Sequence, residues 1–83
     1  MMKWMVTITF KEKPTPEVLA MLPLERARVA ELAGQGVIAD RFFAADGSNV
    51  WFVFQGDSRE MVESALSTLP MHRFFDLDIV QLS

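Results

Sequence analysis

The chain has 83 residues and a mass of 9.4 kDa, so we expect a single domain over residues 1–83. Hydrophobic residues make up 51% of it and the mean hydropathy is +0.20. A folded chain of this mass hides only about 63% of the surface that its unfolded form exposes. We therefore expect a homodimer, or a larger oligomer, that covers the apolar surplus.

Composition and charge exclude several classes of protein. There is no cysteine, which rules out disulfide scaffolds, thiolate zinc sites and thiol nucleophiles, and the single histidine, His72, cannot build a multi-histidine metal site. A net charge of -3 and a pI of about 4.9 give no attraction to nucleic acid or to anionic membranes. The apolar runs are shorter than the roughly 20 residues of a membrane span, and the N-terminal residues show no signal-peptide pattern. We therefore expect a cytoplasmic protein.

A strand and a helical segment are expected first along the chain. Residues 3–11 alternate between apolar and polar side chains and are rich in β-branched residues, which predicts a strand. Residues 17–33 have helical periodicity, which Pro23 must break, kink or begin. Gly34 and Gly36 are expected to end this helical segment.

Three strands and a second helix complete the prediction. Residues 37–45 predict a second strand, and the Asp46-Gly47 pair that follows is typical of a hairpin turn into an apolar third strand over residues 50–55. A capping box in which Asp57 accepts from the Glu60 amide is expected to begin the second helix, which Pro70 ends. The last strand is expected over residues 74–82.

This order of elements predicts an α+β protein with a ferredoxin-like βαββαβ fold. Right-handed crossovers give a four-stranded antiparallel sheet with both helices on one face. The open face should carry either Trp51 and Val53 or Val50, Phe52 and Phe54. A partner's sheet would cover this face and close a dimeric α+β barrel. The rest of the open face is expected to consist of Met5, Thr7, Thr9, Asp76, Asp78, Val80 and Leu82.

Glu25 is the strongest candidate for chemistry. At about 100° per residue it lies roughly 30° from the middle of the apolar stripe on residues 22–33. A carboxyl group facing a pocket between helix and sheet would lose solvation, which raises its pKa toward that of a useful general base. The structural alternative is a glutamate that reaches solvent or pairs with Arg28 or Arg41.

Five further residues are candidates for the rest of a site. His72, in the bend before the last strand, could relay a proton or orient a substrate carboxylate. Arg41 and Arg73 could bind an anionic substrate through a bidentate guanidinium group, and Asn49 and Trp51 could line a pocket wall. The alternatives are a histidine without a role, surface arginines, and a tryptophan in the core or in a dimer interface.

RNA binding is not expected, although the fold is shared with RNA-recognition modules. Residues 47–54 superficially resemble the aromatic pattern that those modules use to stack bases. The segment lacks the leading basic residue, and the chain is acidic.

Several short motifs are spread over nearly the whole chain. Each is modest alone, but their order and spacing together are more specific than any single motif. They are residues 3–10, Leu24-Glu25, Glu31-Leu32 with Gly36, Val53-Phe54, Leu69-Pro70-Met71 and residues 75–79. Together they resemble the muconolactone isomerase family of the dimeric α+β barrel superfamily.

The resemblance implies an activity and a role for one residue. Members of that family convert muconolactone to the 3-oxoadipate enol-lactone, a double-bond shift within a small anionic lactone, with no cofactor and no metal. Glu25 matches the family's proposed proton-transfer glutamate. Family members hold the lactone carboxylate with basic and aromatic residues on the second strand, where Arg41 is the basic residue of this chain.

Two functional hypotheses follow. The first is a cofactor-free isomerase or lyase that acts on a small anionic cyclic metabolite, with Glu25 as general base and His72 and an arginine positioning the substrate. The second is a non-catalytic dimeric module that binds a ligand or assists another enzyme. A pocket filled by side chains, or a Glu25 paired with an arginine, would favour the second.

Overall fold

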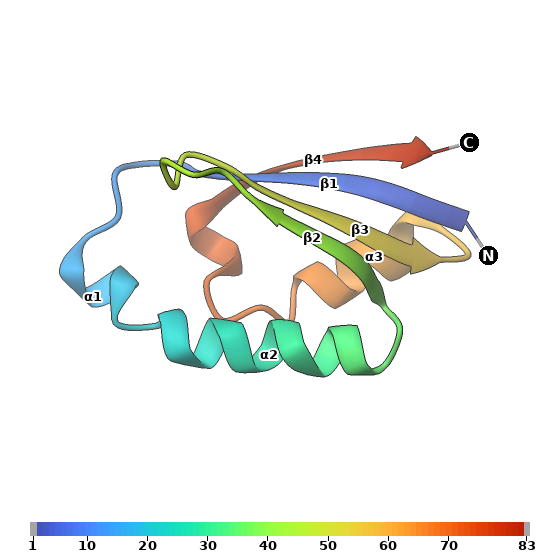
Figure 1. Cartoon of the computed structure of the whole chain (residues 1–83), viewed down its shortest axis with the longest axis horizontal. Helices are drawn as coiled ribbons and strands as arrows, with labels where there is room; N and C mark the ends of the chain where they lie inside the picture. Colours follow the sequence, from blue (N-terminus) through green and yellow to red (C-terminus); the bar gives the residue numbers. More distant parts are fainter. Residues whose placement is uncertain (1, 83) are drawn as a thin grey trace.

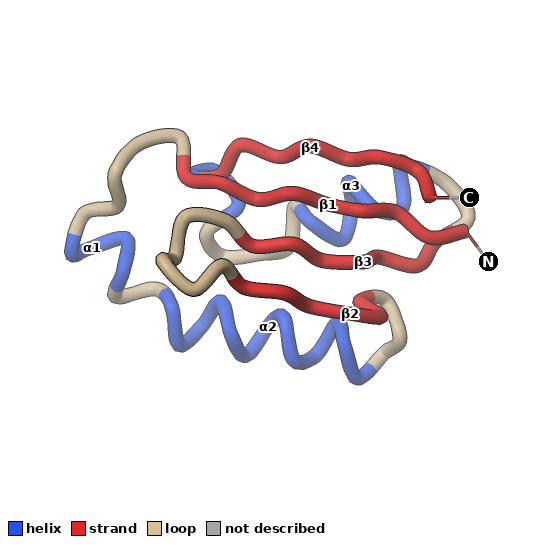
Figure 2. The backbone as a smooth tube through the Cα atoms, turned by 45° about the horizontal axis from the view of Figure 1, so that its top comes forward, coloured by secondary structure: helices blue, strands red, loops and turns tan. Residues whose placement is uncertain are grey.

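A four-stranded antiparallel sheet with helices on one face organises residues 2–82, the part of the chain that the computed structural model describes (Figure 1). The strand order is β2-β3-β1-β4, as Figure 2 shows. This arrangement confirms the predicted ferredoxin-like α+β fold. The elements are β1 (Met2–Phe10), α1 (Pro16–Leu19), α2 (Leu22–Gly34), β2 (Ile38–Phe43), β3 (Val50–Gly56), α3 (Arg59–Leu66), the 3₁₀ turn η1 (His72–Phe74) and β4 (Phe75–Leu82).

Prolines divide the first helical segment, and a glycine follows its end. The segment forms two helices, as the expected break at Pro23 allowed, because prolines stand in the first turns of both α1 and α2. The Oγ1 of Thr15 caps α1 by accepting from the Val18 N–H at 3.3 Å. After α2, Gly36 has a φ of +78°, the left-handed conformation that commonly follows a helix end. No helix within residues 2–82 is long and apolar enough to cross a membrane.

The cap of α3 differs from the prediction. Ser58, and not Asp57, is the N-cap residue, and its Oγ accepts from the Met61 N–H at 3.3 Å. The helix begins one residue later than the capping-box pattern placed it. Ser58 has the extended backbone that an N-cap requires, with φ of -151° and ψ of 160°.

The core lies between the sheet and the two longer helices. Alternate side chains of the central strands β1 and β3 point into it, and α2 and α3 cover them. The Trp4 indole is buried with them, and its Nε1–H donates to the Gly56 carbonyl at 3.1 Å. The most deeply buried side chains are Phe54, Leu32, Leu66, Met71, Val6 and Val62.

A bulge in β2 turns the last residues of that strand. Ile38 pairs with Phe54 whereas Asp40 pairs with Val53, so the register shifts between Ile38 and Asp40. Without the shift, strict alternation would place Arg41 on the opposite face from the buried Ile38. The bulge instead brings Arg41 to the helix-covered face of the sheet.

Within the described residues, no helix covers the second face of the sheet (Figure 1). Phe52 and Phe54 are buried in the core, so alternation places Trp51 and Val53 on the open face. This resolves the choice that the sequence left open. Val80 on the same face is 51% exposed. The total surface of 5344 Å² slightly exceeds the roughly 5,000 Å² typical of a monomer of this mass.

Candidate active site

A pocket of about 350 Å³ lies between the helical layer and the end of the sheet nearest α1. Its walls come from all four strands, the β2–β3 hairpin, α1, α2 and the segment after α3. Apolar side chains form most of the surface, and a few polar groups interrupt it, as is typical of small-molecule sites. The polar and charged residues at its wall include Glu25, Arg26, Arg41, Ser48 and Asn49.

Glu25 is the buried charged residue of this pocket. Its residue surface is 7% exposed, although it lies in the first turn of α2. One carboxylate oxygen, Oε1, accepts from the Met71 N–H at 2.9 Å. Met71 follows α3 and is itself fully buried, so two distant segments meet at the carboxyl group. The stripe position predicted from the helical periodicity is confirmed.

Burial raises the pKa of the Glu25 carboxyl group, because the charged form loses solvation. The hydrogen bond from Met71 and the nearby His72 act in the opposite direction but do not cancel this effect. The ion pairs found among residues 2–82 do not include Glu25. Arg28, one of its expected partners, pairs with Glu31 instead. Both features that would favour the non-catalytic module, a filled pocket and a Glu25 paired with arginine, are therefore missing from the described part of the chain.

The raised pKa of Glu25 predicts how stability changes with pH. The folded chain holds the Glu25 proton more tightly than the unfolded chain does, so wild-type stability falls as the pH rises above the ordinary value of 4.5 and through the folded-state pKa. A Glu25→Gln variant does not titrate at this position and keeps an oxygen that can accept from Met71. The melting temperature of Glu25→Gln minus that of the wild type should be smallest near about pH 4 and should increase toward neutral pH.

Thermal unfolding of both proteins from about pH 4 to about pH 8 measures this difference. Glu31→Gln is the matched control, because Glu31 lies on the same helix with an exposed side chain. A difference that is constant or that shrinks as the pH rises would show that Glu25 is not desolvated.

The bulge and the hairpin bring two of the predicted substrate-binding residues to this pocket. Arg41 reaches it from β2 and Asn49 from the loop before β3. The hairpin is ordered by Gly47, with a φ of +76°, and by the Asp46 carboxylate, whose Oδ1 accepts from the Ser48 N–H at 2.9 Å.

The other three predicted residues lie outside the wall of this pocket. His72 is half-buried in η1, close enough to Glu25 to lower the pKa of that carboxyl group. Arg73 borders a separate depression beside Lys11 and Lys13, and its guanidinium lies 4.9 Å from the Phe74 ring centroid. Trp51 points to the opposite face of the sheet.

Two groups at the pocket were not found from the sequence. Arg26 follows Glu25 on α2; it is exposed, yet it also lines the pocket. The Met71 N–H that holds Glu25 is 46 residues away, and a backbone donor leaves no sequence signal. The one feature of the sequence that pointed to Arg26 was its position next to Glu25.

The fold and the pocket together define a ferredoxin-like α+β protein with a buried carboxyl group in a cavity of ligand size. The sequence profile of the muconolactone delta-isomerase family matches residues 2–83. The chain therefore belongs to this family, and the resemblance noted in the sequence is confirmed. No curated protein sequence matches the chain.

Proposed function

We propose that the protein is a cofactor-independent isomerase or lyase that moves a proton on a small anionic lactone, with Glu25 as general base. The observation that supports this most strongly is a carboxyl group that is 7% exposed, outside any ion pair found among residues 2–82, at the wall of a pocket large enough for a ligand. Membership of the muconolactone delta-isomerase family supports the same class of reaction.

Proton transfer by a single carboxyl group accounts for the proposed isomerisation. The Glu25 carboxylate takes a proton from one ring carbon, the double bond moves, and a proton is returned to another ring carbon, so that no atom is gained or lost. Met71 occupies Oε1 and leaves the second oxygen, Oε2, for the substrate. The raised pKa of Glu25 brings its basicity closer to the working pH, which favours both halves of the transfer. The proposed role of His72 is to stabilise the charged form of Glu25, which is present before the proton is taken up and again after it is returned.

Two guanidinium groups fit the charge of such a substrate. Arg41 and Arg26 both line the pocket, and a guanidinium group binds a carboxylate through paired, charge-assisted hydrogen bonds. Asn49 adds a neutral amide at the same wall. In this proposal these residues orient the lactone so that its reacting carbon faces Glu25.

Arg41→Met is expected to raise KM by about 10- to 100-fold with a smaller change in kcat, because one charge-assisted contact to the substrate contributes about 1.5–3 kcal/mol. Initial rates over a range of substrate concentrations measure this split. Arg59→Met is the matched control, since Arg59 pairs with Glu63 on α3, away from the residues of the pocket. An unchanged KM in Arg41→Met would remove Arg41 from the binding site.

The proposal includes a homodimer formed through the open face of the sheet. Trp51 and Val53 lie there on β3, and β4 adds Val80. Two such faces, packed about 10 Å apart around a twofold axis, would bury these side chains against each other. In this arrangement Trp51 belongs to the interface and not to the substrate pocket of its own chain.

Incubation with muconolactone tests the proposed function. Conversion to an isomeric lactone, followed by NMR, together with a rise in melting temperature would support it. Saturation at 100 times Kd stabilises the folded state by about 2.7 kcal/mol, which is easily measured. A thermal shift without turnover, repeated across a set of small anionic lactones, would favour the ligand-binding or accessory module instead.

A further inference from the structure

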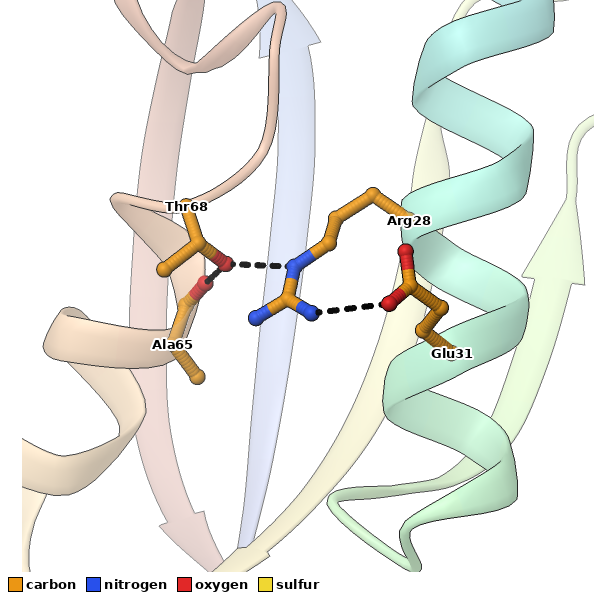
Figure 3. Close-up of polar contacts among 4 residues, drawn as sticks. All are labelled: Arg28, Glu31, Ala65 and Thr68. Carbon is orange, nitrogen blue, oxygen red and sulfur yellow. Dashed lines mark hydrogen bonds and ion pairs between the residues drawn. The ribbon is translucent and has the colours of Figure 1, made fainter.

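A second contact joins the same two segments that meet at Glu25. Arg28 lies three residues after Glu25 on α2, and Thr68 lies three residues before Met71, two residues beyond the end of α3. The Arg28 Nε–H donates to the Thr68 Oγ1 at 3.0 Å, as Figure 3 shows. Since residues three apart on a helix are neighbours on its surface, this contact and the Glu25–Met71 hydrogen bond lie side by side.

Both partners of this contact are held in place. The Thr68 hydroxyl donates to the Ala65 carbonyl at 2.6 Å, which leaves its oxygen free to accept from Arg28. The Arg28 guanidinium is also 3.6 Å from the Glu31 carboxylate, one turn further along α2 (Figure 3). The Arg28 side chain is 26% exposed, so part of it is shielded from competing water. The guanidinium is thus fixed between its own helix and the segment after α3.

We infer that Arg28 and Thr68 are positioning residues, which keep the segment after α3 aligned with α2 so that the Met71 N–H holds Glu25 Oε1. A single hydrogen bond between two segments leaves them free to pivot, whereas two neighbouring bonds fix their relative orientation. The consequence for catalysis rests on the proposed function, because only a transferred proton requires the carboxyl group to be held so closely.

Hydrogen exchange of the Met71 amide tests the positioning role without a substrate. Thr68→Val removes the hydroxyl and keeps the shape of the side chain, and Arg28→Met removes the guanidinium and keeps the stem. Both should accelerate exchange of the Met71 amide by about five- to tenfold, the effect of one lost hydrogen bond. The Val6 amide, in the central strand β1, reports global unfolding and provides the reference.

Ser67→Ala is the matched control. The Ser67 hydroxyl donates to the Ser64 carbonyl at 2.6 Å, as Thr68 does to Ala65, but among residues 2–82 it makes no hydrogen bond to α2. Ser67→Ala should leave Met71 exchange unchanged, and Thr68→Ser should restore wild-type exchange. Equal acceleration in Ser67→Ala and Thr68→Val, or none in Thr68→Val and Arg28→Met, would overturn the inference.

Turnover of muconolactone provides the second readout. Thr68→Val should lower kcat by about threefold to tenfold and leave KM unchanged, because it misplaces the base and does not touch the substrate. A raised KM with unchanged kcat would contradict this role. If the wild type does not convert muconolactone, the proposed function fails for that substrate, while the exchange experiment still decides whether Arg28 and Thr68 position Glu25.

Discussion

Glu25→Gln is expected to lower kcat by about 10²- to 10⁴-fold, the usual contribution of a general acid or base, while the protein stays folded. Gln keeps the size of the side chain and an oxygen that can accept from the Met71 N–H. It cannot take up a proton from the substrate. Circular dichroism and thermal unfolding check the fold. Initial rates with muconolactone, or with a related lactone that the wild type converts, measure the loss of kcat.

Glu31→Gln provides the comparison for this experiment. Glu31 is a glutamate of the same helix with a side chain that is 62% exposed, and its partner is Arg28 instead of a backbone amide in the core. Its replacement should change the rate by much less than that of Glu25. Wild-type turnover in a folded Glu25→Gln protein would exclude Glu25 as the general base.

Val53→Glu is expected to convert the proposed homodimer to a monomer. Val53 lies on β3, one of the two central strands, on the face that alternation turns away from the helices. A twofold interface would contain the new charge twice. Because burying an unpaired charge costs about 3–5 kcal/mol, the dissociation constant should rise by at least about a hundredfold.

Sedimentation analysis over a range of protein concentrations measures this change. Ala30→Glu introduces the same charge at an exposed position of α2 and should leave the dimer intact. A wild-type protein that is monomeric at all concentrations, or a Val53→Glu protein that dimerises as tightly as the wild type, would contradict the proposed interface.

Most of the fold could be predicted because its signals are local. Alternation in β1 separates buried from half-buried side chains, and prolines and glycines mark the limits of α1 and α2 through their own backbone restrictions. The expected end of α3 at Pro70 is wrong, because the helix already ends at Leu66. The helical period also places Glu25 among buried residues, since the position of a side chain around a helix depends only on its spacing.

The features that the sequence did not predict depend on contacts between distant segments. Both faces of β3 are apolar, so alternation alone could not show that Trp51 is on the open one. The bulge that turns Arg41 toward the pocket is a register shift against β3, which the sequence of β2 does not reveal. The Met71 amide meets Glu25 only when the segment after α3 packs on α2.

Deuterium exchange into a bound lactone tests the central claim most directly. The wild-type protein is incubated with muconolactone in D₂O, and proton NMR follows the signals of the ring hydrogens in the lactone and in its isomer. If Glu25 is a general base in this pocket, the wild type should isomerise the lactone or exchange its ring hydrogens for deuterium, and Glu25→Gln should do neither. A lactone that raises the melting temperature of the wild type but is neither isomerised nor deuterated would show that the pocket binds its ligand without moving a proton.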